Sequence, residues 1–149
     1  MPRSNRYILP GRIYHITHRC HNRDWLLKFG KDRDAYRRWL RDGVSRFKIS
    51  ILGYCLTSNH IHLMMYAWTA ESISQFMQLV QGSFAQDYNL GKSRKGAFWE
   101  DRFHCTMIDT GRYLSHPGFN ETGIPFKMRL NPHSLQAFVN LFNSIKHLM

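Results

Sequence analysis

The sequence predicts a single α+β domain in which four strands and two long helices follow the order β-α-β-β-α-β. Three observations carry this prediction. Short stretches alternate apolar and polar residues, two longer stretches repeat apolar residues at helical spacing, and a polar turn joins two neighbouring strand candidates. In this ferredoxin-like order the strands form an antiparallel sheet with both helices on one face. The opposite face is then available to bind a ligand.

The first half of the predicted domain holds a strand followed by a basic helix. Residues 12–19, RIYHITHR, are rich in β-branched and aromatic residues and alternate as a strand does. The alternation places His15 and Thr17 on the face opposite Ile16. From residue 32 or 34 to about residue 47, apolar residues recur at helical spacing between arginines. This stretch predicts an amphipathic helix with one basic, solvated face.

The second half repeats the pattern around a hairpin. Residues 49–56 and 60–66 read as strands, and the intervening Thr57-Ser58-Asn59 has the chemistry of a turn. A second helix is predicted over residues 71–88, with its Met and aromatic stripe in the core. Residues 102–108 are expected to form the fourth strand.

Length and composition are those of one globular domain. The chain has 149 residues, of which 43% are hydrophobic, enough to bury a core. No run approaches the roughly 18 apolar residues of a membrane span, and the basic N-terminus lacks the apolar segment of a signal peptide. Cys20, Cys55 and Cys105 have no CxxC spacing, which indicates neither a disulfide framework nor a cysteine zinc site. A cytoplasmic location fits best.

Positive charge is concentrated in the first third of the chain. The net charge is +11, and residues 1–50 hold 13 Lys and Arg against four Asp and Glu. Such a concentration suits a polyanion, because each neutralised phosphate releases condensed counterions. Charge alone therefore predicts nucleic acid as the partner, with acidic membranes or acidic proteins as alternatives.

Two histidines flank one isoleucine in His60-Ile61-His62, at the start of the predicted third strand. Residues i and i+2 of a strand point to the same face, so the two imidazoles lie side by side. Two neutral imidazoles can chelate a divalent ion and leave coordination positions for other ligands. The alternative is that both are ordinary sheet histidines that hydrogen-bond to their neighbours. Three further histidines could extend a metal site or be bystanders: His15, His18 and His21.

Three stretches in order along the chain resemble one family. They are YHITHRCHNR at residues 14–23, YCLTSNHIHL at 54–63 and GAFWEDRFH at 96–104. Together they are similar to the HUH-superfamily single-tyrosine transposases, in particular to the branch of REP-associated tyrosine transposases. The resemblance covers about residues 1–114, and three collinear motifs are far more specific than one HxH pair.

The resemblance implies a fold, a cofactor, a partner and a reaction. The fold is the ferredoxin-like sheet already predicted, and the HUH pair, here His60 and His62, binds Mg²⁺ or Mn²⁺. The partner is single-stranded or hairpin DNA, with no membrane involved and a homodimer left open. A tyrosine attacks the scissile phosphate to give a 5′-phosphotyrosine and a free 3′-hydroxyl. A phenol of pKa about 10 is a poor nucleophile at neutral pH, so a Lewis acid is needed to withdraw charge from the phosphoryl group.

The chain departs from the family pattern where the nucleophile should lie. The tyrosine normally follows the fourth strand on its own helix, which in some relatives also supplies the third metal ligand. Here Tyr113-Leu114 is followed directly by Ser115-His116-Pro117-Gly118, and no tyrosine occurs later. Proline and glycine would end any helix that presents Tyr113. Residues 115–149 are therefore read as a divergent C-terminal extension, with one helix expected over residues 135–149.

Candidate roles for the remaining residues follow. Tyr113 is the candidate nucleophile, with an aromatic at a helix start as the alternative, while Tyr54 and Tyr88 are read as structural. Phe98 and Trp99 either stack bases or pack in the core. Basic residues that match DNA-holding surfaces of the family are Arg12, Arg19, Arg23, Lys92, Arg94, Lys95 and Arg102, the last of which equally suits a structural ion pair.

Two functions from different classes follow from these residues. The first is a transposase-family protein that binds single-stranded or hairpin DNA and has inherited metal-dependent cleavage and rejoining through phosphotyrosine. The second is a decayed or domesticated DNA-binding module that cannot cut. A metal-dependent nuclease that uses water in place of tyrosine is a third, weaker alternative.

Overall fold

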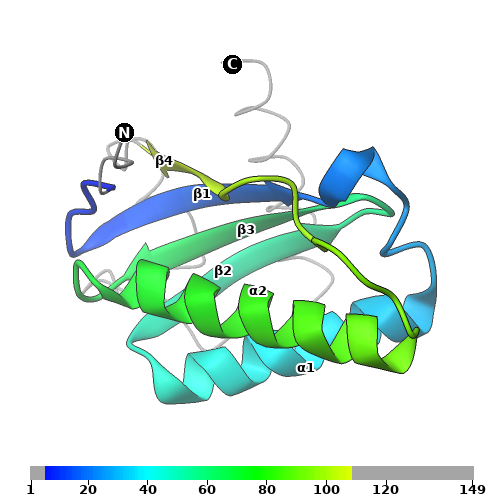
Figure 1. Ribbon diagram of the computed structural model, residues 1–149. Coiled ribbons are helices and arrows are strands. Elements are labelled where there is room, and N and C mark those ends of the chain that lie inside the picture. Colours follow the sequence, from blue (N-terminus) through cyan, green and yellow to red (C-terminus); the bar gives the residue numbers. More distant parts are fainter. Residues whose placement is uncertain (1–5, 109–149) are drawn as a thin grey trace.

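The computed structural model describes residues 6–108 and has the predicted α+β architecture (Figure 1). The predicted element order is confirmed, with one short 3₁₀ helix, η1, added after the first strand. The elements are β1 (Arg12–Arg19), η1 (His21–Arg23), α1 (Gly30–Arg46), β2 (Ile49–Leu56), β3 (His60–Ala67), α2 (Ser72–Gly91) and β4 (His104–Ile108).

The four strands form one antiparallel sheet in the order β2-β3-β1-β4. β3 and β1 are the two central strands, and each side chain of β3 has a partner on β1, as in the pair His62 and Thr17. β2 and β3 make the predicted hairpin around Thr57-Ser58-Asn59, with one irregularity between Ile51 and Gly53. Because paired residues point to the same side of a sheet, this register decides which side chains meet.

Both helices cover the same face of the sheet, as Figure 1 shows. Ile16 of β1 and Ile61 and Leu63 of β3 have no exposed surface, and they pack against α2 residues such as Phe76 in one apolar core. Burial of a side chain of this size contributes about 1.5–3 kcal/mol. These residues orient the sheet, and the residues between them point to the other face.

The two helices approach each other closely at Gly43 of α1. A Cβ atom there would lie 2.6 Å from a ring carbon of Phe76 and 2.8 Å from Cγ2 of Val80. About two turns earlier in α1, the two helices are joined again, where the buried Tyr36 hydroxyl donates a 2.8 Å hydrogen bond to Oε1 of Gln81. A residue without a side chain is therefore needed where α1 crosses α2.

The observed bounds differ little from the predicted ones. The bounds of β1 and β2 are those predicted. α1 begins at Gly30, so Asp32 lies in its first turn and not at its cap. β4 starts at His104 and not at residue 102, since its pairing with β1 begins with Thr17 and His104. The expected helix over residues 135–149 and Tyr113 lie outside the described residues. Within residues 6–108, neither helix is long and apolar enough to cross a membrane.

Candidate functional site

His60 and His62 lie side by side on the face of the sheet that the helices do not cover. Their ring centroids are 4.7 Å apart and the rings meet edge to face. The neighbours Ile61 and Leu63 are fully buried on the helix side, which fixes the orientation of the whole strand. The predicted juxtaposition of the two imidazoles is thus confirmed.

The ring of His60 is held through its Nδ1 atom. Nδ1 lies 2.7 Å from Oδ1 of Asn59 and 2.8 Å from Oγ1 of Thr57, both in the β2–β3 turn. A carboxamide oxygen can only accept, so Nδ1 carries the proton and donates it. The lone pair of the neutral ring is then on Nε2, which is the nitrogen through which a metal ion would bind His60.

The ring of His62 is contacted at the same nitrogen from β1. Its Nδ1 lies 3.2 Å from Nε2 of His15 and 3.3 Å from Oγ1 of Thr17. The His15 and His62 rings are parallel, with centroids 5.4 Å apart. Burial lowers the pKa of His15, which keeps this imidazole neutral next to a ring that must also be neutral to bind a cation.

These contacts are the arrangement that metal-binding histidines require. Such a ring usually uses its second nitrogen to bond a neighbour, which fixes the tautomer and the direction of the ligand nitrogen. Two nitrogen ligands suit a divalent ion that takes its other ligands from oxygen atoms. Among residues 6–108 there is no group of three or more His, Cys, Asp or Glu side chains that could hold a metal ion. His60 and His62 therefore fit as a pair, and a third ligand has to come from elsewhere.

The other candidate ligands do not join the pair. His18 lies on the opposite, helix-covered face and His21 is in η1. Cys55 pairs with His62 across β2 and β3 and shares its face, but burial raises the pKa of its thiol, so it is a poor ligand at neutral pH. Sequence reasoning treated His15 as a bystander and missed the support that Thr17 gives. Both lie on the predicted face, but only the register of β1 against β3 brings them to His62.

Six of the seven tyrosines fall within residues 6–108, and four of them are structural. Tyr14 and Tyr36 are buried in the core, and burial raises the pKa of Tyr36. Tyr54 packs against the core, and Tyr88 of α2 does the same, with its ring 4.8 Å from that of Phe98. The structural reading of Tyr54 and Tyr88 is confirmed.

The candidate DNA-binding residues divide into three groups. Arg19 pairs with His60 across the strands, so it is exposed on the same face and at the same end of the sheet. Arg23 joins that end, since the side chain of Asn59 donates to its carbonyl. Arg102 is near this end too, because Glu100 donates a backbone hydrogen bond to Arg19.

The second and third groups are placed differently. Arg94 is committed to its own loop, where it donates to Asn89 and to the carbonyls of Gly96 and Ala97. Lys92 lies 3.4 Å from Asp32 of α1, while the nearby Lys95 is exposed. Arg12 is at the other end of β1, roughly 23 Å from Arg19 at 3.3 Å per residue, and its side chain starts on the helix face. The structure therefore does not place Arg12 beside the histidine pair.

Phe98 and Trp99 pack in the protein. Phe98 is 2% exposed and its ring stands edge-on to those of Phe84 and Tyr88. Trp99 stacks on His18 at 4.5 Å and donates its indole N–H to the carbonyl of Gln81. The packing alternative is confirmed for both residues.

Residues 10–115 match the family described as "Transposase IS200 like". This match spans more than half of the chain. The chain belongs to the IS200-like transposase family. No curated protein is similar enough to count as a match.

Two solved structures resemble the fold. A REP-associated tyrosine transposase bound to a REP hairpin superimposes with a TM-score of 0.58 at 17% identity, covering 73% of this chain and 63% of that one. A protein from Deinococcus radiodurans described as a transposase gives a TM-score of 0.56 at 16% identity, covering 73% and 87%. At these identities the likeness concerns the fold alone. The chain spans 63% of the length of the REP-associated transposase.

Proposed function

We propose that this IS200-like transposase family member binds hairpin-bearing single-stranded DNA across the sheet face that carries His60 and His62. One observation carries the proposal: His60 and His62 lie side by side on the same face, with ring centroids 4.7 Å apart, and neighbours position each ring through contacts at Nδ1. Arg19 on that face, with Arg23 next to it, supplies positive charge for the phosphates that flank the scissile one. Membership of the family and the hairpin-bound relative support DNA as the partner.

The inherited reaction is strand cleavage through a phosphotyrosine. A bound Mg²⁺ or Mn²⁺ would withdraw charge from the phosphoryl group. His60 and His62 would hold that ion, and Arg19 would orient the adjacent backbone. A tyrosine oxygen would form a bond to phosphorus as the bond to the 3′-oxygen breaks, with the phenol proton lost to water and a proton taken up by the leaving oxygen. Tyr113 is the proposed nucleophile because it follows β4 in the sequence, as the tyrosine of the family follows the fourth strand.

The second candidate is a module that binds DNA without cutting it. The observation that favours it is the sequence after Tyr113, where Pro117 and Gly118 would end a helix of the kind on which the family presents its tyrosine. The DNA-holding residues Arg19 and Arg23 need no nucleophile to contact phosphate. Binding would survive in this case, and the histidine pair would remain as an inherited feature.

The test is to incubate the protein with labelled hairpin-bearing single-stranded DNA and Mn²⁺ and to look for a denaturant-resistant adduct. The variants are Tyr113→Phe and His60→Ala/His62→Ala, with Tyr88→Phe as the matched control for loss of a phenol elsewhere. An adduct that survives in the control and is lost in the other two variants supports the transposase. Binding without adduct or cleavage supports the second candidate, and cleavage without attachment points to attack by water.

A further inference from the structure

We propose that an exposed aromatic corner beside the start of α1 binds unpaired nucleotides of single-stranded DNA. The aromatic corner consists of Trp25, Lys28, Phe29, Lys31 and Lys92. The inference rests on the proposed function for its substrate class, and the aromatic corner adds a second contact area for the same DNA. None of the five residues belongs to the face of the sheet that carries His60 and His62, which we call the histidine face.

Two large aromatic side chains are exposed in the six-residue loop between η1 and α1, residues 24–29. Trp25 is 67% exposed and Phe29 is 56% exposed. Leu27, between them, has no exposed surface and donates a backbone hydrogen bond of 2.9 Å to Ser58. Arg33 adds hydrogen bonds to the carbonyls of Leu27 and Lys28. The loop is therefore anchored, and it turns both rings outward at little further cost in conformational entropy.

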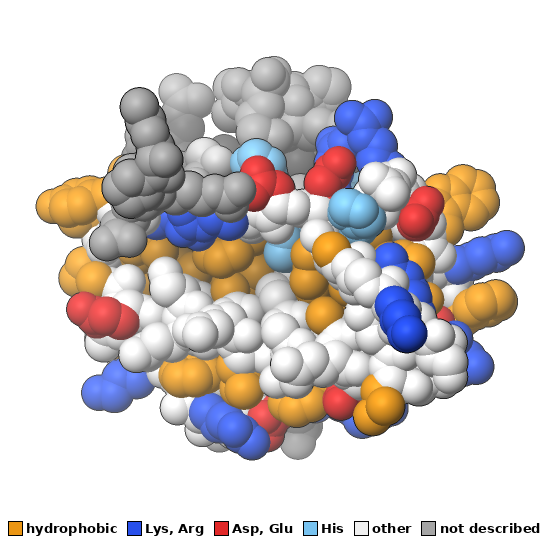
Figure 2. Space-filling model, in the orientation of Figure 1, with side chains coloured by type: hydrophobic (Ala, Val, Ile, Leu, Met, Phe, Trp, Pro, Cys, Tyr) orange, Lys and Arg blue, Asp and Glu red, His pale blue; other side chains and the backbone are white. Residues whose placement is uncertain are grey.

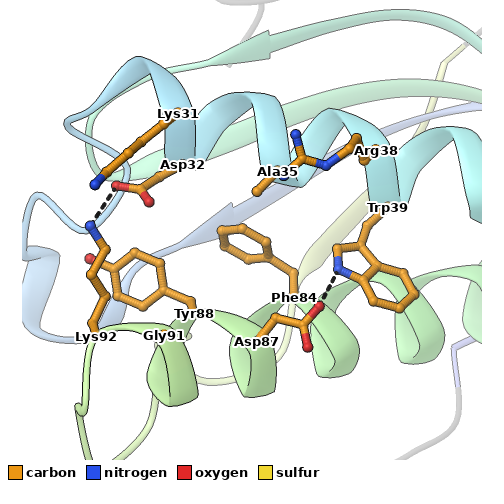
Figure 3. A pocket seen from close by; sticks show the side chains of 10 residues that line it. All are labelled: Lys31, Asp32, Ala35, Arg38, Trp39, Phe84, Asp87, Tyr88, Gly91 and Lys92. Carbon is orange, nitrogen blue, oxygen red and sulfur yellow. Dashed lines mark hydrogen bonds and ion pairs between the residues drawn. The ribbon is translucent and has the colours of Figure 1, made fainter.

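Two lysines lie near the ring of Phe29. Nζ of Lys28 lies 5.8 Å from the centroid of the Phe29 ring, and Nζ of Lys92 lies 5.4 Å from it and 5.5 Å from that of Tyr88. Figure 3 shows Lys31 and Lys92 at one end of the groove of about 410 Å³ between α1 and α2, where Lys92 pairs with Asp32. On the right of Figure 2, where η1 leads into α1, hydrophobic and basic side chains alternate along the edge of the molecule.

This combination selects unpaired nucleotides. An exposed ring offers a stacking surface to a base, and the lysines around it attract the phosphates on either side of that base. Paired bases in a duplex do not present their faces, so the corner discriminates against the hairpin stem. A second copy of the chain is disfavoured as the occupant, because the chain carries a net charge of +11 and would bring lysines against lysines.

The corner is continuous with the histidine face. The loop that carries Trp25 follows Arg23 directly, and the β2–β3 turn contacts both: Asn59 bonds the carbonyl of Arg23 and Ser58 accepts from Leu27. A DNA strand that leaves the histidine pair past Arg19 and Arg23 therefore meets Trp25 next. The corner would hold the unpaired strand beside the hairpin while the hairpin lies across the sheet.

The test uses fluorescence anisotropy to measure the affinity of the protein for three DNAs. They are a hairpin alone, the same hairpin with a run of unpaired thymidines, and free oligothymidine. The unpaired run should tighten binding by the wild-type chain at least about fivefold, as one stacked base does. Trp25→Ala and Phe29→Ala should each remove most of this gain and weaken oligothymidine binding, while changing affinity for the bare hairpin less than about twofold. The matched control is Trp68→Ala, a half-exposed tryptophan at the other end of the sheet, which should keep the gain.

The inference would be overturned if the unpaired run tightened hairpin binding equally in the wild-type, Trp25→Ala and Phe29→Ala proteins. It would also be overturned if Trp68→Ala removed this gain in affinity as fully as Trp25→Ala does. A dimer in sedimentation that Trp25→Ala dissociates would also overturn it in favour of self-association. If the wild-type chain does not bind the hairpin but binds oligothymidine through Trp25, the proposed function fails and the corner stands.

Discussion

The two faces of β1 carry histidines in opposite situations. On the helix-covered face, His18 is 5% exposed, accepts a hydrogen bond at Nδ1 from the Gln81 amide and donates from Nε2 to the carbonyl of Asp101. Its ring also stacks on Trp99. On the other face, His15 supports His62, which in turn lies beside His60. Residue type alone therefore does not mark a site; what matters is where the second nitrogen of each ring is directed.

One strand can thus serve stability through one face and ligand binding through the other. Both nitrogens of His18 are used inside the protein, so this imidazole acts as a polar part of the core. The contacts of His60 and His62 fix one nitrogen of each ring and set the direction of the other. Changes on the helix-covered face should therefore alter stability, and changes on the face of His60 and His62 should alter ligand binding.

The largest expected effect is on stability, from Leu63→Ala. Leu63 has no exposed surface and faces the helices, so its truncation should lower the free energy of unfolding by about 2–5 kcal/mol. Urea denaturation followed by circular dichroism measures the loss. His62→Ala, one residue away on the other face, is the matched control and should cost far less stability. Equal losses in the two variants would mean that the faces are not distinct.

The next effect concerns the close approach of the two helices. Gly43→Ala would place its Cβ 2.6 Å from Phe76, and this overpacking should cost about 1–3 kcal/mol of unfolding free energy despite the better helix propensity of alanine. Gly82→Ala in α2, with nothing within 4 Å, should stabilise by about 0.5–1 kcal/mol. Thermal or urea unfolding measures the change in unfolding free energy for both variants. The two changes should have opposite signs if the contact at Gly43 is as tight as the structure has it.

A smaller effect is expected on metal affinity when His62 loses its support. His15→Ala removes the ring that lies 3.2 Å from Nδ1 of His62, and loss of such a partner typically weakens metal binding about tenfold or more. Titration with Mn²⁺ measures the change. His21→Ala, in η1, serves as the control for loss of a histidine. Unchanged affinity in His15→Ala would show that the contact does not orient His62.

The smallest effect is a pH dependence of stability from His18. Burial first, and then the charge of Arg6, lower the pKa of His18 below its ordinary value of 6.5. The unfolded chain therefore binds this proton at a higher pH than the folded chain does. The free energy of unfolding should be highest above pH 6.5 and should fall as the pH drops from there toward the folded-state pKa.

His18→Gln should flatten this decline, as measured by urea denaturation across that pH range, while His21→Gln should leave it in place. His15, whose pKa burial also lowers, should supply part of the slope that remains. A decline as steep in His18→Gln as in the wild-type chain would contradict the assignment.

Much of the fold could be predicted because its signals are local. Alternation along residues 12–19 and helical spacing along α1 and α2 depend only on neighbouring residues, as does the shared face of His60 and His62. The contacts around the pair could not be predicted in the same way. Thr17 and His62 meet only because β1 pairs with β3 in one particular register, which alternation does not fix.

Surface charge was the least predictable part. A sequence does not say which arginines a loop will use for itself, and Arg94 spends its guanidinium on three acceptors of residues 89–97. Arg12 and Arg19 flank the same strand, yet eight alternating residues put them at opposite ends and on opposite faces. The exposure of Trp25 and Phe29 likewise depends on the burial of Leu27 between them.

We propose above that His60 and His62 together bind a divalent ion on the face of the sheet that the two helices do not cover. The most direct measurement is a Mn²⁺ titration, followed by electron paramagnetic resonance of the free ion, on the wild-type chain, His60→Ala/His62→Ala and His18→Gln. A saturable site in the wild-type and His18→Gln proteins that is lost in the double variant is the predicted result. Equal Mn²⁺ binding by the wild-type chain and the double variant would contradict the account.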